Sequence, residues 1–138
     1  MADEELARAA AQGDAEAVLA ALDAGGSATG SKSLLYAASG GHVDTVKLLL
    51  ERGADPKTAD EDGVTALTLA ASEFYAVILD ELIMAGADPL ATDKNGLTAK
   101  QVLALHASGA TDLSNEENEL ILACRALLET AETKAQNA

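Results

Sequence analysis

A fourteen-residue segment of the chain occurs twice, and this repetition restricts the possible folds more than any other feature. The segment Gly53–Ala66 reads GADPKTADEDGVTA, and Gly86–Ala99 reads GADPLATDKNGLTA; they agree at eight positions with an offset of 33 residues. A period of this length is typical of proteins built from stacked supersecondary units, which bury their apolar faces only against one another. The sequence therefore predicts a repeat protein.

Each repeat is predicted to contain two short helices. The alanine pair Ala37-Ala38 allows the first helix to approach its neighbour closely, and Val46, Leu49 and Leu50 form an apolar stripe on the second. The same residues recur in similar form 33 positions later. A glycine follows each second helix, where a left-handed residue commonly ends a helix.

We divide the chain into one domain of four repeats. The first repeat is degenerate, with polar residues Arg8, Gln12 and Glu16, and the last carries Lys100 where the middle repeats have leucine, so both are expected to cap the stack. The predicted bounds are 4–30, 31–63, 64–96 and 97–130, with an insert at 109–115 and a disordered tail at 131–138.

The last repeat ends in a helical pattern that places five apolar residues on one face: Leu120, Ile121, Cys124, Leu127 and Leu128. The third repeat departs from the pattern in the turn between its helices, where Phe74-Tyr75 replace the Gly41-His42 of the second repeat. The two aromatic residues either fill a gap against the insert or form an exposed anchor, and the sequence leaves both alternatives open.

The repeat motifs resemble those of the ankyrin-repeat family. Residues 65–71 read TALTLAA and correspond to the T-P-L-H-x-A-A start of an ankyrin repeat. The other motifs are G-H at 41–42, G-A-D at 53–55 and 86–88, and the D-x-x-G fingertip at 60–63 and 93–96. The resemblance covers residues 4 to 130 and implies an all-α solenoid of stacked antiparallel helix pairs with short projecting β-hairpin or turn fingers.

Charge and composition exclude several functions. The chain carries 23 acidic and 9 basic residues, a net charge of −14 that is spread evenly, which disfavours nucleic acid and anionic membranes as partners. No apolar run approaches the roughly 18 residues of a membrane span, and the acidic N-terminus lacks the features of a signal peptide. A single cysteine excludes an internal disulfide. We expect an intracellular, cytoplasmic monomer.

No residues with catalytic or metal-binding spacing are found. His42 belongs to a structural turn, His106 lies near the end of a helix, and Cys124 belongs to an apolar face. The loop around Asp93 fails as a calcium site because Ala91 and Val102 stand where ligands are required. We expect no enzyme activity, no cofactor and no metal.

The resemblance implies that the chain binds another protein on a concave surface of fingertips and inner helices. The positions implied are Ala11, Gln12, Ser31, Ser39, Gly40, Glu61, Asp62, Val64, Ser72, Glu73, Lys94, Asn95, Leu97, Leu105 and His106. Glu61, Asp62 and Glu73 form an acidic trio beside Val64, which favours a basic partner surface.

Three roles for such a surface are open. The first is an adaptor or scaffold, and the second is an acidic inhibitor or immunity-type protein that blocks a basic enzyme. A third, a module cut from a longer protein, is disfavoured by the initial Met and the polar terminal repeats.

Overall fold

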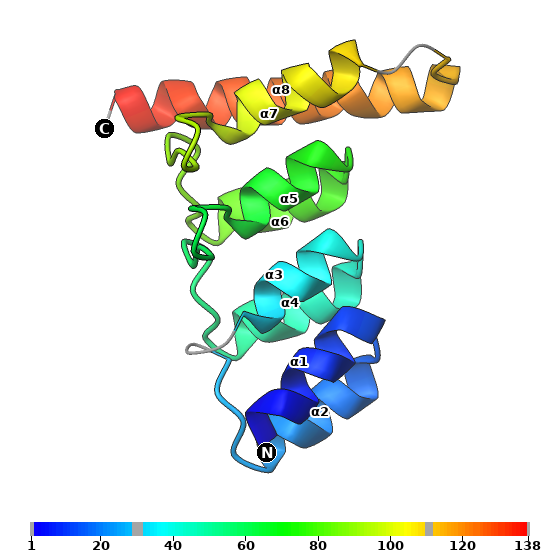
Figure 1. The fold of residues 1–138 in the computed structure, drawn as a ribbon, viewed down its shortest axis with the longest axis vertical. Helices are drawn as coiled ribbons and strands as arrows, with labels where there is room; N and C mark the ends of the chain where they lie inside the picture. Colours follow the sequence, from blue (N-terminus) through cyan, green and yellow to red (C-terminus); the bar gives the residue numbers. More distant parts are fainter. Residues whose placement is uncertain (1, 29–31, 110–111, 138) are drawn as a thin grey trace.

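The computed structural model describes residues 2–28, 32–109 and 112–137, which form a stack of antiparallel helix pairs (Figure 1). Eight helices lie in these ranges: α1 (Ala2–Gln12), α2 (Ala15–Asp23), α3 (Ser33–Ser39), α4 (Val43–Glu51), α5 (Ala66–Ser72), α6 (Ala76–Met84), α7 (Ala99–Ser108) and α8 (Asn115–Gln136). The same ranges hold no strand, only an isolated bridge between Ala59 and Thr65. The predicted all-α repeat fold is confirmed.

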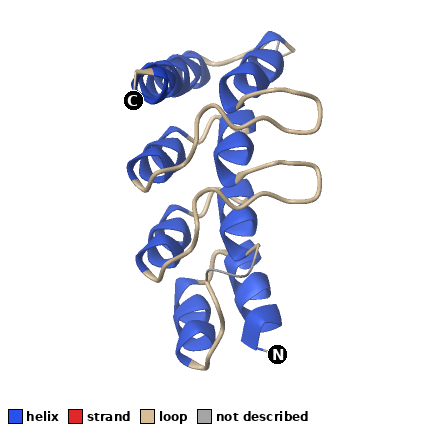
Figure 2. Ribbon diagram, turned by 90° about the vertical axis from the view of Figure 1, so that its left-hand side faces the viewer, coloured by secondary structure: helices blue, strands red, loops and turns tan. Residues whose placement is uncertain are grey.

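The helices form two columns, one of odd-numbered and one of even-numbered helices. Along the first column α1 contacts α3, α3 contacts α5 and α5 contacts α7, and the even-numbered helices follow one another in the same way. Figure 2 shows both columns, with two long loops projecting on the side of the odd-numbered helices. We call α1, α3, α5 and α7 the inner helices and the others the outer helices.

The core lies mainly between successive pairs. Ala37 and Ala38 of α3 and Ala70 and Ala71 of α5 are fully buried, so these inner helices pack closely. The outer helices contribute larger side chains, such as Leu49 of α4, Leu79 and Leu82 of α6 and Leu128 of α8, which are also fully buried. The prediction that each repeat buries its apolar face against its neighbours is confirmed.

The two projecting loops, residues 54–64 and 87–97, are called the first and second fingers. An aspartate organises each tip: Asp60 Oδ1 accepts hydrogen bonds from the amides of Asp62 and Val64, at 2.8 and 2.9 Å. Asp93 Oδ1 accepts equivalent bonds from the amides of Asn95 and Leu97, at 2.8 and 3.1 Å. The D-x-x-G motif is therefore a side-chain-stabilised turn.

Threonines mark the starts of two inner helices. Thr65 Oγ1 accepts a hydrogen bond from the Thr68 amide, and Thr98 forms a reciprocal capping box with Gln101. Each finger is thus followed directly by an N-cap residue, which fixes the position of the finger relative to the inner helix that begins there.

The turns between paired helices stack on one another through aromatic rings. His42 lies over Gly13 of the preceding turn, and its Nε2 is 3.0 Å from the carbonyl oxygen of Ala11. Tyr75 lies over Gly41 in the same manner. Phe74 occupies the position of Gly41 and shares its positive φ, at 62° against 75°. Phe74 and Tyr75 are half-buried and pack against the core, so they are not a freely exposed anchor.

The C-terminal region differs from its prediction in two ways. Residues 131–136 belong to α8 and are not a disordered tail, because Ala131 is buried and Glu132 forms an ion pair with Lys100 at 3.7 Å. Leu120 was predicted on the buried face of this helix, but it is 43% exposed because its turn lies near the start of α8, beyond most of the core. Ile121, Cys124 and Leu128 are buried as predicted.

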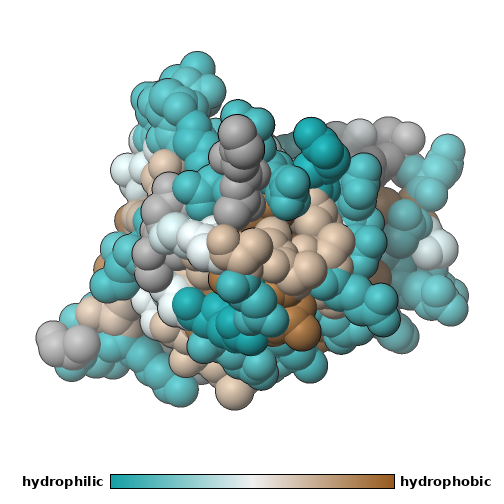
Figure 3. All heavy atoms as spheres, turned by 90° about the horizontal axis from the view of Figure 1, so that it is seen from below, coloured by the Kyte–Doolittle hydropathy of each residue, from teal (hydrophilic) through white to brown (hydrophobic). Residues whose placement is uncertain are grey.

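The N-terminal end of the stack is only partly polar. Figure 3 looks onto this end and shows apolar residues gathered at its centre and hydrophilic residues around them. A shallow surface groove here contains Ala17 and Ala20 together with Glu5, Arg8 and Gln12.

Candidate protein-binding surface

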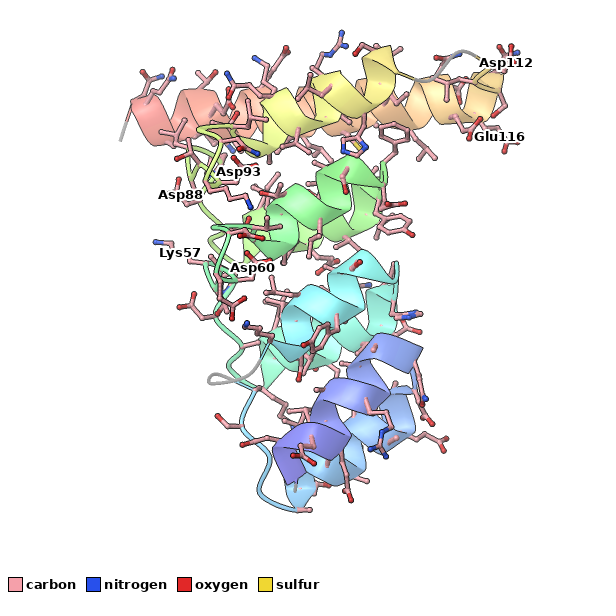
Figure 4. All side chains as sticks on the ribbon, viewed as in Figure 1. Lys57, Asp60, Asp88, Asp93, Asp112 and Glu116 are labelled. Atoms are coloured by element: carbon pink, nitrogen blue, oxygen red, sulfur yellow. The ribbon has the colours of Figure 1, made fainter. Side chains whose placement is uncertain are left out.

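The fingers and the inner helices together form the surface on which the predicted contact residues lie. Figure 2 shows the fingers projecting alongside the inner helices, and Figure 4 shows Asp60 and Asp93 within the fingers. The exposed members of the predicted set are Ala11, Gln12, Ser39, Gly40, Glu61, Asp62, Glu73, Lys94, Asn95, Leu105 and His106. Val64, Ser72 and Leu97 are half-buried, and Ser31 lies outside the described residues.

These residues form two rows and not one cluster. Glu61 and Asp62 lie in the first finger, before α5 begins, whereas Glu73 follows the last residue of α5. A helix of this length separates its ends by about 10 Å, at a rise of about 1.5 Å per residue. The acidic trio predicted from the sequence is therefore divided between the finger row and a second row at the far ends of the inner helices.

The finger row is held together by ion pairs between neighbouring repeats. Lys32, at the start of α3, binds the carboxylate of Glu61, and Lys94 Nζ lies 3.1 Å from Asp62 Oδ1. The hydrogen bond from Lys32 lowers the pKa of the exposed Glu61, and the same bond raises the pKa of Lys32. Two of the three carboxylates expected to attract a basic partner are thus already paired with lysines.

Tyr36 lies between the two rows and was missed by the sequence analysis. It is in the middle of α3, one helical turn after Lys32, and its side chain is 45% exposed. The signal available in the sequence was an aromatic residue at the position that Leu69 occupies in the next repeat. Lys32 was missed as well, because its partner is 29 residues away.

A comparison of the sequence with models of known protein families agrees with the stack of helix pairs and fingers. A family model described as ankyrin repeats in three copies matches residues 6–93. The chain belongs to the ankyrin-repeat family. Ankyrin repeats are generally protein–protein interaction modules, and the family is typically non-catalytic.

Two curated proteins show local similarity to this ankyrin-repeat chain. It is 62% identical over 40 residues to the E3 ubiquitin-protein ligase hecd-1 of Caenorhabditis elegans and 45% identical over 47 residues to Protein HOS4 of Saccharomyces cerevisiae. The matched segments make up 29% and 34% of this chain but only 2% and 4% of those proteins. The similarity is therefore about one repeat long.

The second row includes the most exposed apolar residue of the predicted set. Leu105 of α7 is 57% exposed, and His106 beside it is exposed as well. Leu105 and Tyr36 are large side chains that the inner helices leave exposed to solvent. They are therefore the strongest candidates on this surface for residues that anchor a partner.

The described part of the ankyrin stack offers no site for metal chemistry. No group of three His, Cys, Asp or Glu side chains within it is placed to hold a metal ion. Cys124 is fully buried in the core, and burial raises the pKa of its thiol to about 11, so the thiol is not a nucleophile at neutral pH. No helix in the same part of the chain is long and apolar enough to cross a membrane.

Proposed function

We propose that this ankyrin-repeat chain is a non-enzymatic adaptor that binds one protein partner across its fingers and inner helices. The observation that carries the proposal is the exposed aromatic residue Tyr36, flanked by the Lys32–Glu61 ion pair in the middle of this surface. Tyrosine is among the residues that most often dominate the binding energy of interfaces. Leu105 supplies a second anchor two repeats further along the stack, on α7.

The surface that the partner presents contains both apolar and charged groups, and its basic groups outnumber its acidic groups. Glu61 and Asp62 are paired, but the chain as a whole carries a charge of −14, so its field attracts cations. Such a field chiefly accelerates association and contributes less to final affinity. In this proposal the chain acts as a cytoplasmic monomer, and the paired lysines fix the shape of the finger row.

A second candidate follows from the same charge. An acidic protein with pI near 4.2 suits the inhibition of a basic enzyme, by covering its cationic substrate site. The two candidates differ in the partner: an adaptor binds without altering catalysis, whereas an inhibitor abolishes the activity of the enzyme it captures.

Affinity purification with quantitative mass spectrometry tests the proposal. Three baits are compared: the natural chain, the double variant Tyr36→Ala with Leu105→Ala, and the control Met84→Ala with Leu122→Ala, whose residues are exposed apolar side chains on the outer helices α6 and α8. The proposal expects a partner that the first and third baits retain and the second loses. A partner lost with the control and retained by the Tyr36 variant would refute it. An activity assay on a captured enzyme then decides between adaptor and inhibitor.

A further inference from the structure

A small apolar pocket lies at the turn side of the stack, at the opposite end of the helix pairs from the fingers. Its volume is about 200 Å³, and its walls include Val43 of α4, Phe74, Tyr75 and Val77 around the start of α6, and Leu120 of α8. Val77 is 56% exposed and Leu120 is 43% exposed. Residues from three successive repeats therefore meet in a pocket that is open to solvent.

Phe74 gives the pocket a wall that the other turns lack. It is the one non-glycine residue with positive φ in the described part of the chain, and the equivalent residues Gly13 and Gly41 take the same conformation without a side chain. A bulky residue in this conformation is strained, and such strain persists where surrounding contacts hold it in place. The ring of Phe74 packs against the core while also facing the pocket.

The other wall comes from the overhang of α8. The first turns of this helix reach beyond the ends of α5 and α6, and Glu116 lies on this overhang (Figures 1 and 4). Leu120 follows one turn later on the same helix and completes the pocket.

The fixed charges close in sequence to the pocket walls are mainly negative. Residues 33–46, 58–93 and 101–124 contain no Lys or Arg, and Lys47, one turn after Val43 on α4, forms an ion pair with Glu81 at 3.7 Å. Exposed carboxylates adjoin the apolar walls in sequence, namely Asp44 beside Val43, Glu73 beside Phe74, and Glu116 one turn from Leu120. An apolar hollow with such surroundings is complementary to an apolar side chain that has cationic neighbours.

We propose that this pocket binds a short segment of another protein in which one large apolar side chain is flanked by Lys or Arg residues. The pocket is smaller than the about 300–1,000 Å³ typical of small-molecule sites, and it suits a single side chain. The carboxylates bind the flanking cations. None of the residues that line the pocket belongs to the contact set predicted for the fingers and inner helices, and of the neighbouring carboxylates only Glu73 belongs to both surfaces.

An NMR titration of the isotope-labelled full chain tests the proposal with three synthetic peptides of equal length. One carries a leucine between two pairs of lysines, one has serine in place of the leucine, and one has glutamates in place of the lysines. The first peptide should shift the amide signals of residues 41–43, 74–78 and 116–120, and the other two should not. Leu120→Glu should weaken this binding at least about tenfold, as loss of a central anchor does.

The matched control is Leu122→Glu, which introduces the same charge on the same helix at a residue that is 60% exposed and does not line the pocket. It should bind the first peptide as the natural chain does. Absence of shifts, shifts confined to the fingers, equal binding of the serine peptide, or equal loss in both variants would each overturn the proposal. Sedimentation showing a dimer that Leu120→Glu dissolves would assign the pocket to a second copy and overturn it as well.

Discussion

Lys94 joins the two fingers through both its side chain and its backbone: its Nζ lies 3.1 Å from Asp62 Oδ1, and its amide donates to the Asp62 carbonyl at 2.8 Å. The tip of one repeat is thus fixed to the tip of the next. The finger row behaves as one surface because each tip is held both by its own aspartate and by its neighbour.

The side-chain part of this contact should contribute little to stability. Both groups are more than half exposed, so a double-mutant cycle of Asp62→Ala and Lys94→Ala should give a coupling of about 0.2–1 kcal/mol. Urea unfolding at low and high salt measures this coupling, which should shrink as salt screens the pair. A coupling above about 2 kcal/mol that salt leaves unchanged would contradict the expectation for an exposed pair.

The stacking core should be far more sensitive. Leu82→Ala on α6, or Leu49→Ala on α4, should lower the free energy of unfolding by about 2–5 kcal/mol, because each side chain is fully buried between repeats. Met84→Ala, on the same helix as Leu82 but 75% exposed, should change it by no more than about 0.5 kcal/mol. Urea unfolding followed by circular dichroism compares the three; equal losses would mean that the buried face is misassigned.

The strained turn can be tested by paired substitutions at one position. Phe74→Gly and Phe74→Ala both remove the ring, but φ is 62° here, so the glycine variant should be more stable by about 1 kcal/mol. At Glu73, where φ is −103°, the same pair should show no advantage for glycine. Thermal unfolding of the four variants measures both differences. An alanine variant at Phe74 as stable as the glycine variant would rule out the left-handed conformation.

The buried thiol should make stability fall at alkaline pH. Burial raises the pKa of Cys124 from 9.0 to about 11, so above pH 9 the unfolded chain loses its thiol proton while the folded chain keeps it. The free energy of unfolding should therefore decrease as pH rises from 9 to 11, by at most about 1.4 kcal/mol per pH unit from this group. Cys124→Ala removes this component, and the difference between the two pH profiles isolates it. Parallel profiles across this range would show that the thiol titrates normally in the folded state.

The fold was predictable because its determinants are periodic. The glycine spacing and the apolar stripe that includes Val46 and Leu49 define helix pairs wherever they recur, and the structure places these side chains in the core. The disordered tail was wrongly predicted because residues 131–138 are polar in composition. The ion pairs of Lys100 with Glu129 and Glu132 and the burial of Ala131 extend α8, and these contacts depend on how α7 and α8 pack.

The binding surface was less predictable because exposure varies between equivalent positions. Tyr36 is 45% exposed, Leu69 is half-buried and Val102 is 8% exposed, although the three occupy one position of the repeat. Their exposure depends on the neighbouring repeats and not on the motif. The pairing of Glu61 with Lys32 likewise depends on where the first finger folds relative to the start of α3.

The central claim is that a protein partner binds the fingers and inner helices. It is tested most directly by the association rates of the captured partner at two ionic strengths. One variant neutralises Glu61, Asp62 and Glu73. A matched variant neutralises Glu81 and Asp23, which pair with Lys47 at 3.7 Å and Arg52 at 3.3 Å, together with the exposed Asp80 of α6.

Both variants change the net charge by the same amount, so a difference between them reports position. The first should slow association and flatten its salt dependence, because opposed charges chiefly steer encounter, and the second should differ little from the natural chain. Equal effects of the two variants would show that only overall charge matters and would contradict binding on the fingers and inner helices.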